Sequence, residues 1–182
     1  ATARHRVSPS RTSVAVGCGV DFSLTETFEP VAGAGLTSSA TSLHAGASAR
    51  VEHVRVARAG CGRAHVGSTS IVAHADAQIR SGALQIGPGP LRHGVTADLI
   101  GDGATVELRG LSIPGAGGHH DTEATVRHTA SAGTSRQTFA GVVPDRARVS
   151  FGGHVVVAGG TTGTDADQQS RNLLMGPTAR AA

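Results

Sequence analysis

The densest group of side chains able to bind a metal ion is His119-His120-Asp121, followed by Glu123 and His128. In a β-strand His119, Asp121 and Glu123 share one face, and His120 lies on the other. Two histidines and one carboxylate form a ligand set that binds iron or zinc. We therefore take His119, Asp121 and His128 as candidate metal ligands, with His128 at the far end of the strand. The alternative is that these histidines are structural.

Two cysteines, Cys18 and Cys61, offer thiolate chemistry. They form neither a CxxC motif nor a zinc-binding spacing. Cys18 stands at a turn position that small residues fill elsewhere in the chain, which favours a packing role. Gly60-Cys61-Gly62 is typical of an exposed loop, so Cys61 is the better candidate for a reactive thiol.

The composition excludes several function classes. All 16 basic residues are arginine, and without lysine neither a Walker-type phosphate loop nor a lysine Schiff base can form. Four phenylalanines are the only aromatic residues, too few for a base-stacking platform, and the formal charge of +3 is dispersed along the chain. No apolar run is long enough for a membrane span or a signal peptide. The sequence therefore predicts a cytoplasmic protein that binds neither nucleic acid nor membrane.

The elements that must position the candidate residues are strands separated by a recurrent turn. The turn is rich in Gly, Ala and Ser and begins at Gly17, Gly46, His74, Gly101 and Ser131, at steps of 29, 28, 27 and 30 residues. Similar turns at Pro144 and Gly176 fall out of this step. The segments between the turns show the alternation and β-branched residues of strands. A fixed repeat of this length indicates a solenoid.

Aligning the units places similar residues in columns. The predicted columns are Val51, Ile79, Val106; Ile71, Leu99, Val126; Thr69, Ala97, Ala124; Ser70, Asp98, Thr125; Glu52, Arg80, Glu107; and the histidines His65, His93, His120. The apolar columns and the histidines share the inner face by parity, while the charged column alternates in sign and so avoids like-charge repulsion. Such columns favour an all-β parallel β-helix with coils of about 27–30 residues over a two-sheet sandwich.

The second half of the chain resembles the SufB/SufD family of scaffold proteins in SUF iron–sulfur cluster assembly. The segment from Asp165 to Leu174 is similar to that family's Q-x-N-R-N-L-L signature and contains Gln168, Arg171, Asn172, Leu173 and Leu174, to which we assign a structural role. The resemblance extends to Phe139-Ala140-Gly141-Val142-Val143, to Ala147–Gly153, to parts of the His119–His128 stretch, and to Ala49–Val54 and His65-Val66-Gly67. It covers residues from about 35 to 180.

The resemblance implies a right-handed parallel β-helix and a non-enzymatic scaffold role, with residues 1–182 as one core domain and 1–16 as a poorly defined lead-in. It implies two partners: a SufB-like or SufD-like paralogue that pairs through the β-helix, and a SufC-like ATPase. It also implies an iron–sulfur cluster held transiently at the level of the complex, with no cluster ligand assigned within this chain.

This sequence departs from the family pattern in places. Gly163 and Ser170 stand where lysine and asparagine are usual, and no residue matches the family's Lys-Cys-Ser-His-Gly-Ala-type motif or its terminal helical regions. We expect the chain to be a truncated form that self-associates. The family resemblance leaves SufB-like and SufD-like identity open.

Two other functions remain alternatives. A β-helix enzyme acting on polysaccharide would use carboxylates such as Asp98, Asp121 or Glu123 in an outer groove, but it would want aromatic platforms. A purely structural solenoid would have no ligand.

Overall fold

The computed structural model describes residues 6–30 and 33–182, which form thirteen β-strands and no helix. The strands are β1 (Arg6–Val16), β2 (Asp21–Phe28), β3 (Gly35–Ala45), β4 (Arg50–Arg58), β5 (Arg63–Ala73), β6 (Gln78–Gly87), β7 (Leu91–Leu99), β8 (Thr105–Pro114), β9 (His119–His128), β10 (Thr134–Val143), β11 (Arg148–Val157), β12 (Asp165–Leu174) and β13 (Arg180–Ala181). This part of the chain therefore contains no helix of the length and apolarity that crossing a membrane requires.

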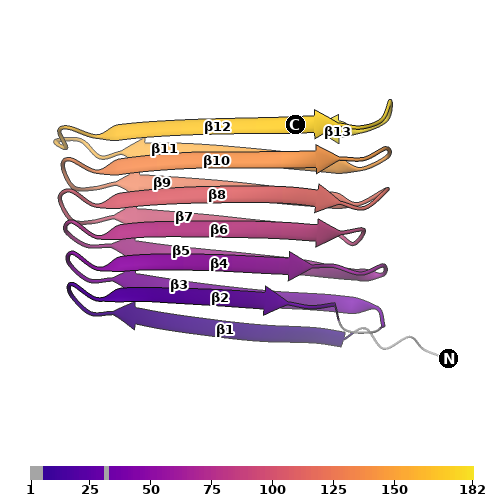
Figure 1. The fold of residues 1–182 in the computed structure, drawn as a ribbon, viewed down its shortest axis with the longest axis horizontal. Coiled ribbons are helices and arrows are strands. Elements are labelled where there is room, and N and C mark those ends of the chain that lie inside the picture. The colour runs from indigo at the N-terminus through magenta and orange to yellow at the C-terminus, as the bar shows by residue number, and fades with distance from the viewer. Residues whose placement is uncertain (1–5, 31–32) are drawn as a thin grey trace.

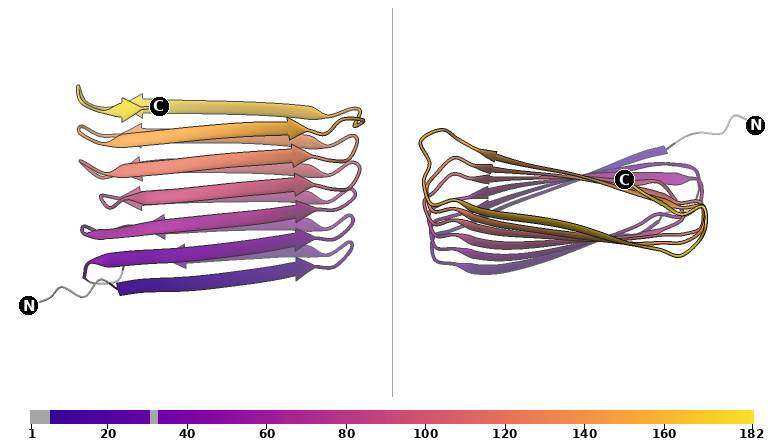
Figure 2. Two further views of the ribbon diagram at one scale, coloured as in Figure 1. Left: turned by 180° about the vertical axis from the view of Figure 1, so that it is seen from behind. Right: turned by 90° about the horizontal axis from the view of Figure 1, so that it is seen from above.

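The strands form two parallel sheets that face each other. The odd-numbered strands, in the order β1-β3-β5-β7-β9-β11-β13, make one sheet (sheet A), and the even-numbered strands from β2 to β12 make the other (sheet B). In Figure 1 the nearer strands run to the right and those behind run to the left as the chain rises, so the coil is right-handed. Seen from above, it is a flattened tube (Figure 2). The predicted right-handed parallel β-helix is confirmed.

The backbone conformation of the recurrent turn explains why the same small residues recur in it. Its third residue adopts a left-handed backbone, as at Ser48 (φ 58°), Asp76 (φ 57°) and Gly103 (φ 72°). Its fourth residue is a fully buried alanine at Ala49, Ala77 and Ala104, and this residue's N–H donates to the carbonyl of the first. The turn therefore selects residues that tolerate positive φ at one position and a methyl group at the next.

The tube has an apolar half and a polar half. Near the end where β3 and β5 finish, inward side chains pack into one apolar cluster that includes Leu43, Ile71, Ala97 and Val126 from sheet A and Val51, Ile79, Val106 from sheet B. The column Val51–Ile79–Val106 is confirmed by the strand register. Toward the other end of the strands, many inward positions carry serine, threonine, histidine and arginine, beside two small apolar clusters around Leu91 and Val143.

The charged column is also confirmed. Glu52, Arg80 and Glu107 are neighbours across β4, β6 and β8, and Arg80 binds Glu52 at 3.2 Å and Glu107 at 3.5 Å. Because the signs alternate, the Arg80 guanidinium forms an ion pair with a carboxylate on each side.

The four predicted columns on sheet A, the histidine column included, are wrong by two residues at β7. Leu91 pairs with His65, 26 positions earlier, so Ile71 lies beside Ala97 rather than Leu99, and Thr69 lies beside Val95 rather than Ala97. Likewise, Ser70 and Thr125 flank Thr96 rather than Asp98. The short turn before β7 removes two residues from the coil. Because the shift is even, each side chain keeps its predicted face.

Coil length therefore varies more than predicted, from 26 residues between His65 and Leu91 to 32 between Arg148 and Arg180. The out-of-step turns at Pro144 and Gly176 belong to a second series, since they precede β11 and β13 at the opposite ends of the strands. The lead-in predicted for residues 1–16 is also corrected: Arg6–Val16 forms β1, which pairs with β3 throughout, while residues 1–5 lie outside the described part.

Stacked turns leave no room for a side chain at Gly101, which gives a first prediction. A Cβ atom there would lie 2.0 Å from the backbone nitrogen of Ala75. We expect Gly101→Ala to lower the free energy of unfolding by about 1–3 kcal/mol, because backbone atoms of two coils must separate. Urea denaturation measures the change. Gly94 is the matched control, since a Cβ there meets no atom within 4 Å and Gly94→Ala should be neutral. Equal effects of both substitutions would contradict this account of turn stacking.

Candidate functional site

The predicted metal ligands separate into an exposed pair and a buried residue. His119 Nε2 lies 3.2 Å from Asp121 Oδ1 on the outer face of sheet A, and Ser150 Oγ donates a hydrogen bond to the same carboxylate. His128 is buried at the other end of β9, where Nε2 lies 2.9 Å from Ser135 Oγ. The structure therefore brings His119 and Asp121 together but does not bring His128 to them.

No group of three or more His, Cys, Asp or Glu side chains in the described residues is arranged to hold a metal ion. Glu123, the remaining carboxylate of this stretch, binds Arg92 at 3.2 Å. Asp98 binds Arg127 at 3.1 Å on the same sheet. The carboxylates that a polysaccharide-acting enzyme would use, Asp98, Asp121 and Glu123, are therefore each bound by a basic side chain.

The predicted histidine column is corrected, whereas its inward orientation is confirmed. His65 and His120 both pair with Leu91, and His93 lies one inward position further along β7, between Gly67 and Thr122. All three are buried. His120 Nε2 donates to the carbonyl of Gly87 at 3.0 Å, and His93 Nε2 lies 3.0 Å from Thr69 Oγ1.

A buried arginine lies at the centre of the polar half. Arg55 on β4 is 1% exposed; its Nη2 donates to Ser39 Oγ at 2.7 Å and to His65 Nε2 at 2.6 Å. Its guanidinium also stacks over the Phe28 ring at 4.3 Å. Gly67 makes the room, because a Cβ there would overlap the guanidinium. Accepting from Arg55 requires His65 Nε2 to be unprotonated.

Glu26 supplies the opposite charge inside the same coils. Its Oε2 accepts from Thr41 Oγ1 at 2.7 Å and from His53 Nε2 at 3.0 Å, and His53 Nδ1 lies 2.9 Å from Ser81 Oγ. Burial raises the pKa of the Glu26 carboxyl, but hydrogen bonds from Thr41, Thr12 and His53 outweigh it and hold that pKa below its ordinary value. The interior therefore holds a carboxylate and a guanidinium of opposite charge, and the buried Arg63 adds a second guanidinium at the start of β5.

The buried histidines are held neutral. Burial lowers the pKa of His65 to about 4, that of His93 to about 3 and that of His120 to about 4, and the Arg55 charge adds to the effect on His65 and His93. Burial also lowers the pKa of Arg55 to about 10, against the opposing charge of Glu26. Neutral histidines, serines and threonines thus surround the opposite charges of Glu26 and Arg55 in this half of the tube.

Sequence reasoning missed Glu26, His53 and Arg55. The signal was available, because His53 and Arg55 are two and four residues after the inward-facing Val51 and so share its face. A charged residue at an inward position of a strand marks a buried polar cluster, here spanning β2 to β6.

The signature residues all lie on β12. Gln168, Asn172 and Leu174 pair with the buried Gln137, Gly141 and Val143 and so occupy inward positions, whereas Arg171 and Leu173 face outward. The amide groups of Gln168 and Asn172 lie where Cβ atoms of Gly153 and Gly141 would be. Two amides of this signature thus fill space that two glycines leave.

Cys18 and Cys61 are both free and exposed. Cys18 lies in the turn between β1 and β2, and Cys61 in the turn between β4 and β5, at opposite ends of the strands.

Comparison with known proteins agrees with this architecture. The family model described as the SUF system FeS cluster assembly, SufBD core domain, matches residues 1–182. The iron–sulfur cluster assembly protein SufD of Escherichia coli (strain K12) is 27% identical over 143 residues, which are 79% of this chain and 34% of that protein. The chain thus spans about a third of the length of this relative. No solved structure shows a significant match. The β-solenoid and the match over its whole length show that the chain belongs to the SufBD core domain family.

Proposed function

We propose that this chain is the β-solenoid core of a SufD-like scaffold subunit that helps to assemble iron–sulfur clusters in the cytoplasm. The observation that carries the proposal is the family match across all 182 residues, and the SufD relative supports it. The cluster is cargo of the complex and passes through it transiently. The chain contributes shape and binding surface and carries out no catalytic step.

The proposal assigns two partners, a SufB-like or SufD-like paralogue that pairs through the solenoid and a SufC-like ATPase, and it assigns neither nucleic acid nor membrane. A regular stack of coils suits this role because it presents long, flat sheet faces whose positions are fixed by the strand register. A polysaccharide-acting enzyme is less well supported, since Asp98 and Glu123 each bind an arginine and Asp121 binds His119.

Reconstitution of the complex tests the proposal. The full-length protein is mixed with its paralogue and ATPase, then with ferrous iron, sulfide and reductant, and cluster is measured by visible absorption and by iron and sulfide content. We expect cluster to accumulate with all partners present and to fall about tenfold or more when this protein is omitted. Equal cluster yield without it, or failure of the three proteins to associate, would overturn the proposal.

The same assay tests His119 and Asp121 as a contact for iron. Two donors from this chain need further ligands from a partner to complete a site. If they contact iron, the His119→Ala, Asp121→Ala double variant retains less iron in the assembled complex, whereas His154→Ala, at an exposed histidine on the same face, retains the full amount. Full iron retention by the double variant would remove the pair from the cluster site.

A further inference from the structure

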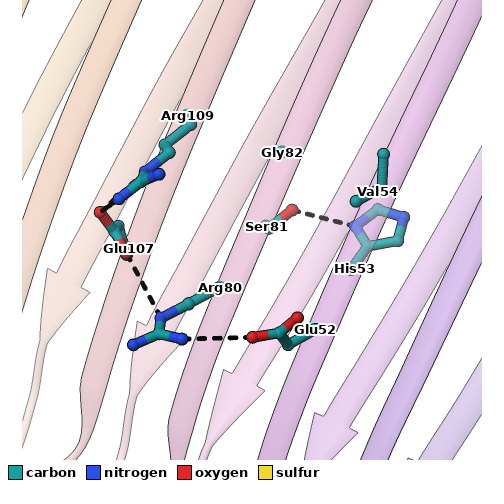
Figure 3. A pocket seen from close by; sticks show the side chains of 8 residues that line it. All are labelled: Glu52, His53, Val54, Arg80, Ser81, Gly82, Glu107 and Arg109. Atoms are coloured by element: carbon teal, nitrogen blue, oxygen red, sulfur yellow. Dashed lines mark hydrogen bonds and ion pairs between the residues drawn. The ribbon is translucent and has the colours of Figure 1, made fainter.

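A shallow trough crosses the outer face of sheet B. Two adjoining hollows of about 310 and 330 Å³ form it, and they share Val54, Gly82 and Arg109. These three residues are neighbours across β4, β6 and β8, so the trough runs across the strands, along the axis of the solenoid. Figure 3 shows Gly82 between Val54 and Arg109, with the charged residues to one side.

The trough exists because its floor lacks side chains. Gly82 leaves open space, with only a carbonyl oxygen 3.9 Å from where its Cβ would lie. The Arg109 side chain turns out of its own column to bind Glu107. The next floor residue, Thr138 on β10, is small.

One wall of the trough is apolar. Leu84 and Leu111 are neighbours on β6 and β8, next to Val56 on β4, and they line this side; Val54 lies beside them in the floor. Val54 is 46% exposed and Leu111 is 36% exposed. A row of exposed aliphatic side chains bordering a hollow is typical of a docking surface.

The other wall is the charged column Glu52–Arg80–Glu107. Its signs alternate − + − at successive strands. Glu52 is 66% and Arg80 71% exposed in their ion pair, so both retain free surface for a second partner. Glu107 is only 25% exposed and is bound by both Arg80 and Arg109, so its charge is already matched. Exposed pairs of this kind are individually weak, and exchanging or sharing them costs little.

The spacing of the two walls fits an α-helix. Glu52 and Val56 are four residues apart on β4, or about 13 Å at the rise of a strand, and a helix with its side chains is about 10–12 Å across. Adjacent strands lie about 4.8 Å apart, close to the 5.4 Å pitch of a helix, so residues one turn apart on a helix meet successive strands.

We propose that this trough binds an amphipathic helix of a partner protein. The helix places its apolar face against Leu84 and Leu111, and it presents a positive and a negative side chain at successive turns to Glu52 and Arg80. The charge pattern sets orientation and register, while the apolar wall supplies most of the affinity. This surface lies on sheet B, whereas His119 and Asp121 lie on sheet A, and the proposal does not depend on the assembly role.

Two designed peptides test the charge pattern. Each is a fluorescein-labelled helix of about 18 residues with the same leucine face; one carries Arg, Glu and Arg at successive turns, and the other carries Glu, Arg and Glu. Binding to the full-length protein is followed by fluorescence anisotropy at low salt. We expect the Arg–Glu–Arg peptide to bind about fivefold or more tightly than its inverse, because it makes favourable pairs with Glu52 and Arg80 where its inverse makes two unfavourable ones.

Variants of the protein locate the binding. Leu111→Gln should weaken both peptides about fivefold or more, and Arg80→Glu should abolish the preference for Arg–Glu–Arg over Glu–Arg–Glu by removing the sign alternation. Val66→Gln is the control, since Val66 is 42% exposed on the outer face of sheet A. Circular dichroism checks that each variant is folded. No saturable binding up to about 1 mM, equal binding of both peptides, or binding unaffected by Leu111→Gln would overturn the proposal. Self-association of the protein that Leu111→Gln abolishes would also overturn it, because the trough would then hold a second copy.

Discussion

Lowering the pH from about 7.5 to 5 is expected to destabilise the solenoid strongly. The pKa values of His65 and His120 are about 4 and that of His93 is about 3, against an ordinary value of 6.5. The unfolded chain therefore binds protons that the folded chain excludes. The stability that these neutral histidines contribute is complete above pH 6.5 and is lost as the pH falls below it.

The expected loss is large compared with the stability of a domain. At pH 5 each histidine lies about 1.5 units below its unfolded pKa, which corresponds to about 2 kcal/mol. The three histidines together lower the free energy of unfolding by about 6 kcal/mol at pH 5, and the free energy of unfolding of a typical domain is about 5–15 kcal/mol. Protonation of Glu26, whose pKa is held low, acts in the same direction at still lower pH. Urea denaturation followed by circular dichroism at several pH values measures the dependence.

The groups around His93 explain why it resists protonation. Burial is the main cause, and the charge of Arg55 together with His53 and His65 adds to it. His93→Gln should reduce the slope of unfolding free energy against pH by about 1.4 kcal/mol per unit between pH 6 and 4. His74→Gln, at an exposed turn histidine, should leave the slope unchanged. Equal slopes for wild type and His93→Gln would refute the assignment of this acid sensitivity to the interior.

Strand periodicity predicted which side chains point inward, and it did so even where the register was wrong. Leu99 and His93 are both buried as expected, although the short turn before β7 shifts each by two positions relative to β5. Period-two alternation survives an even shift, while column membership does not. The spacing of the recurrent turns does not reveal this two-residue shift. The turn at one end of a coil can be longer while the turn at the other end is shorter, and the distance between recurrent turns then stays nearly the same.

The candidate site shows the limits of grouping residues by proximity in sequence. His119 and His128 are nine positions apart in one strand, an odd number that places them on opposite faces, so parity already separated the proposed metal ligands. The Glu26–His53–Arg55 cluster needed a second kind of information. Parity orients each residue, but only the packing of sheet A on sheet B brings Ser39 and His65 to the guanidinium of Arg55.

Replacing Arg55 with alanine is expected to lower the free energy of unfolding by about 3–5 kcal/mol. The substitution removes the positive charge that interacts with the Glu26 carboxylate inside the same coils, and removing one of two opposite buried charges is costly. It also removes the donor to Ser39 and His65 and empties the space over Phe28. Denaturant unfolding at pH 7.5 measures the change.

Arg58 is a matched control on the same strand. Its guanidinium lies 3.5 Å from Glu29 Oε1, with both side chains more than half exposed, so Arg58→Ala should cost less than about 1 kcal/mol. A second variant separates charge from packing: Glu26→Gln in the Arg55→Ala background removes the stranded carboxylate and should recover part of the loss. If that double variant is no more stable than Arg55→Ala alone, the effect of Arg55 arises from packing and hydrogen bonds rather than from its charge. If Arg55→Ala lowers the free energy of unfolding no more than Arg58→Ala does, the buried network does not stabilise the first coils. Removing a buried guanidinium would then have the same effect as removing a solvated one.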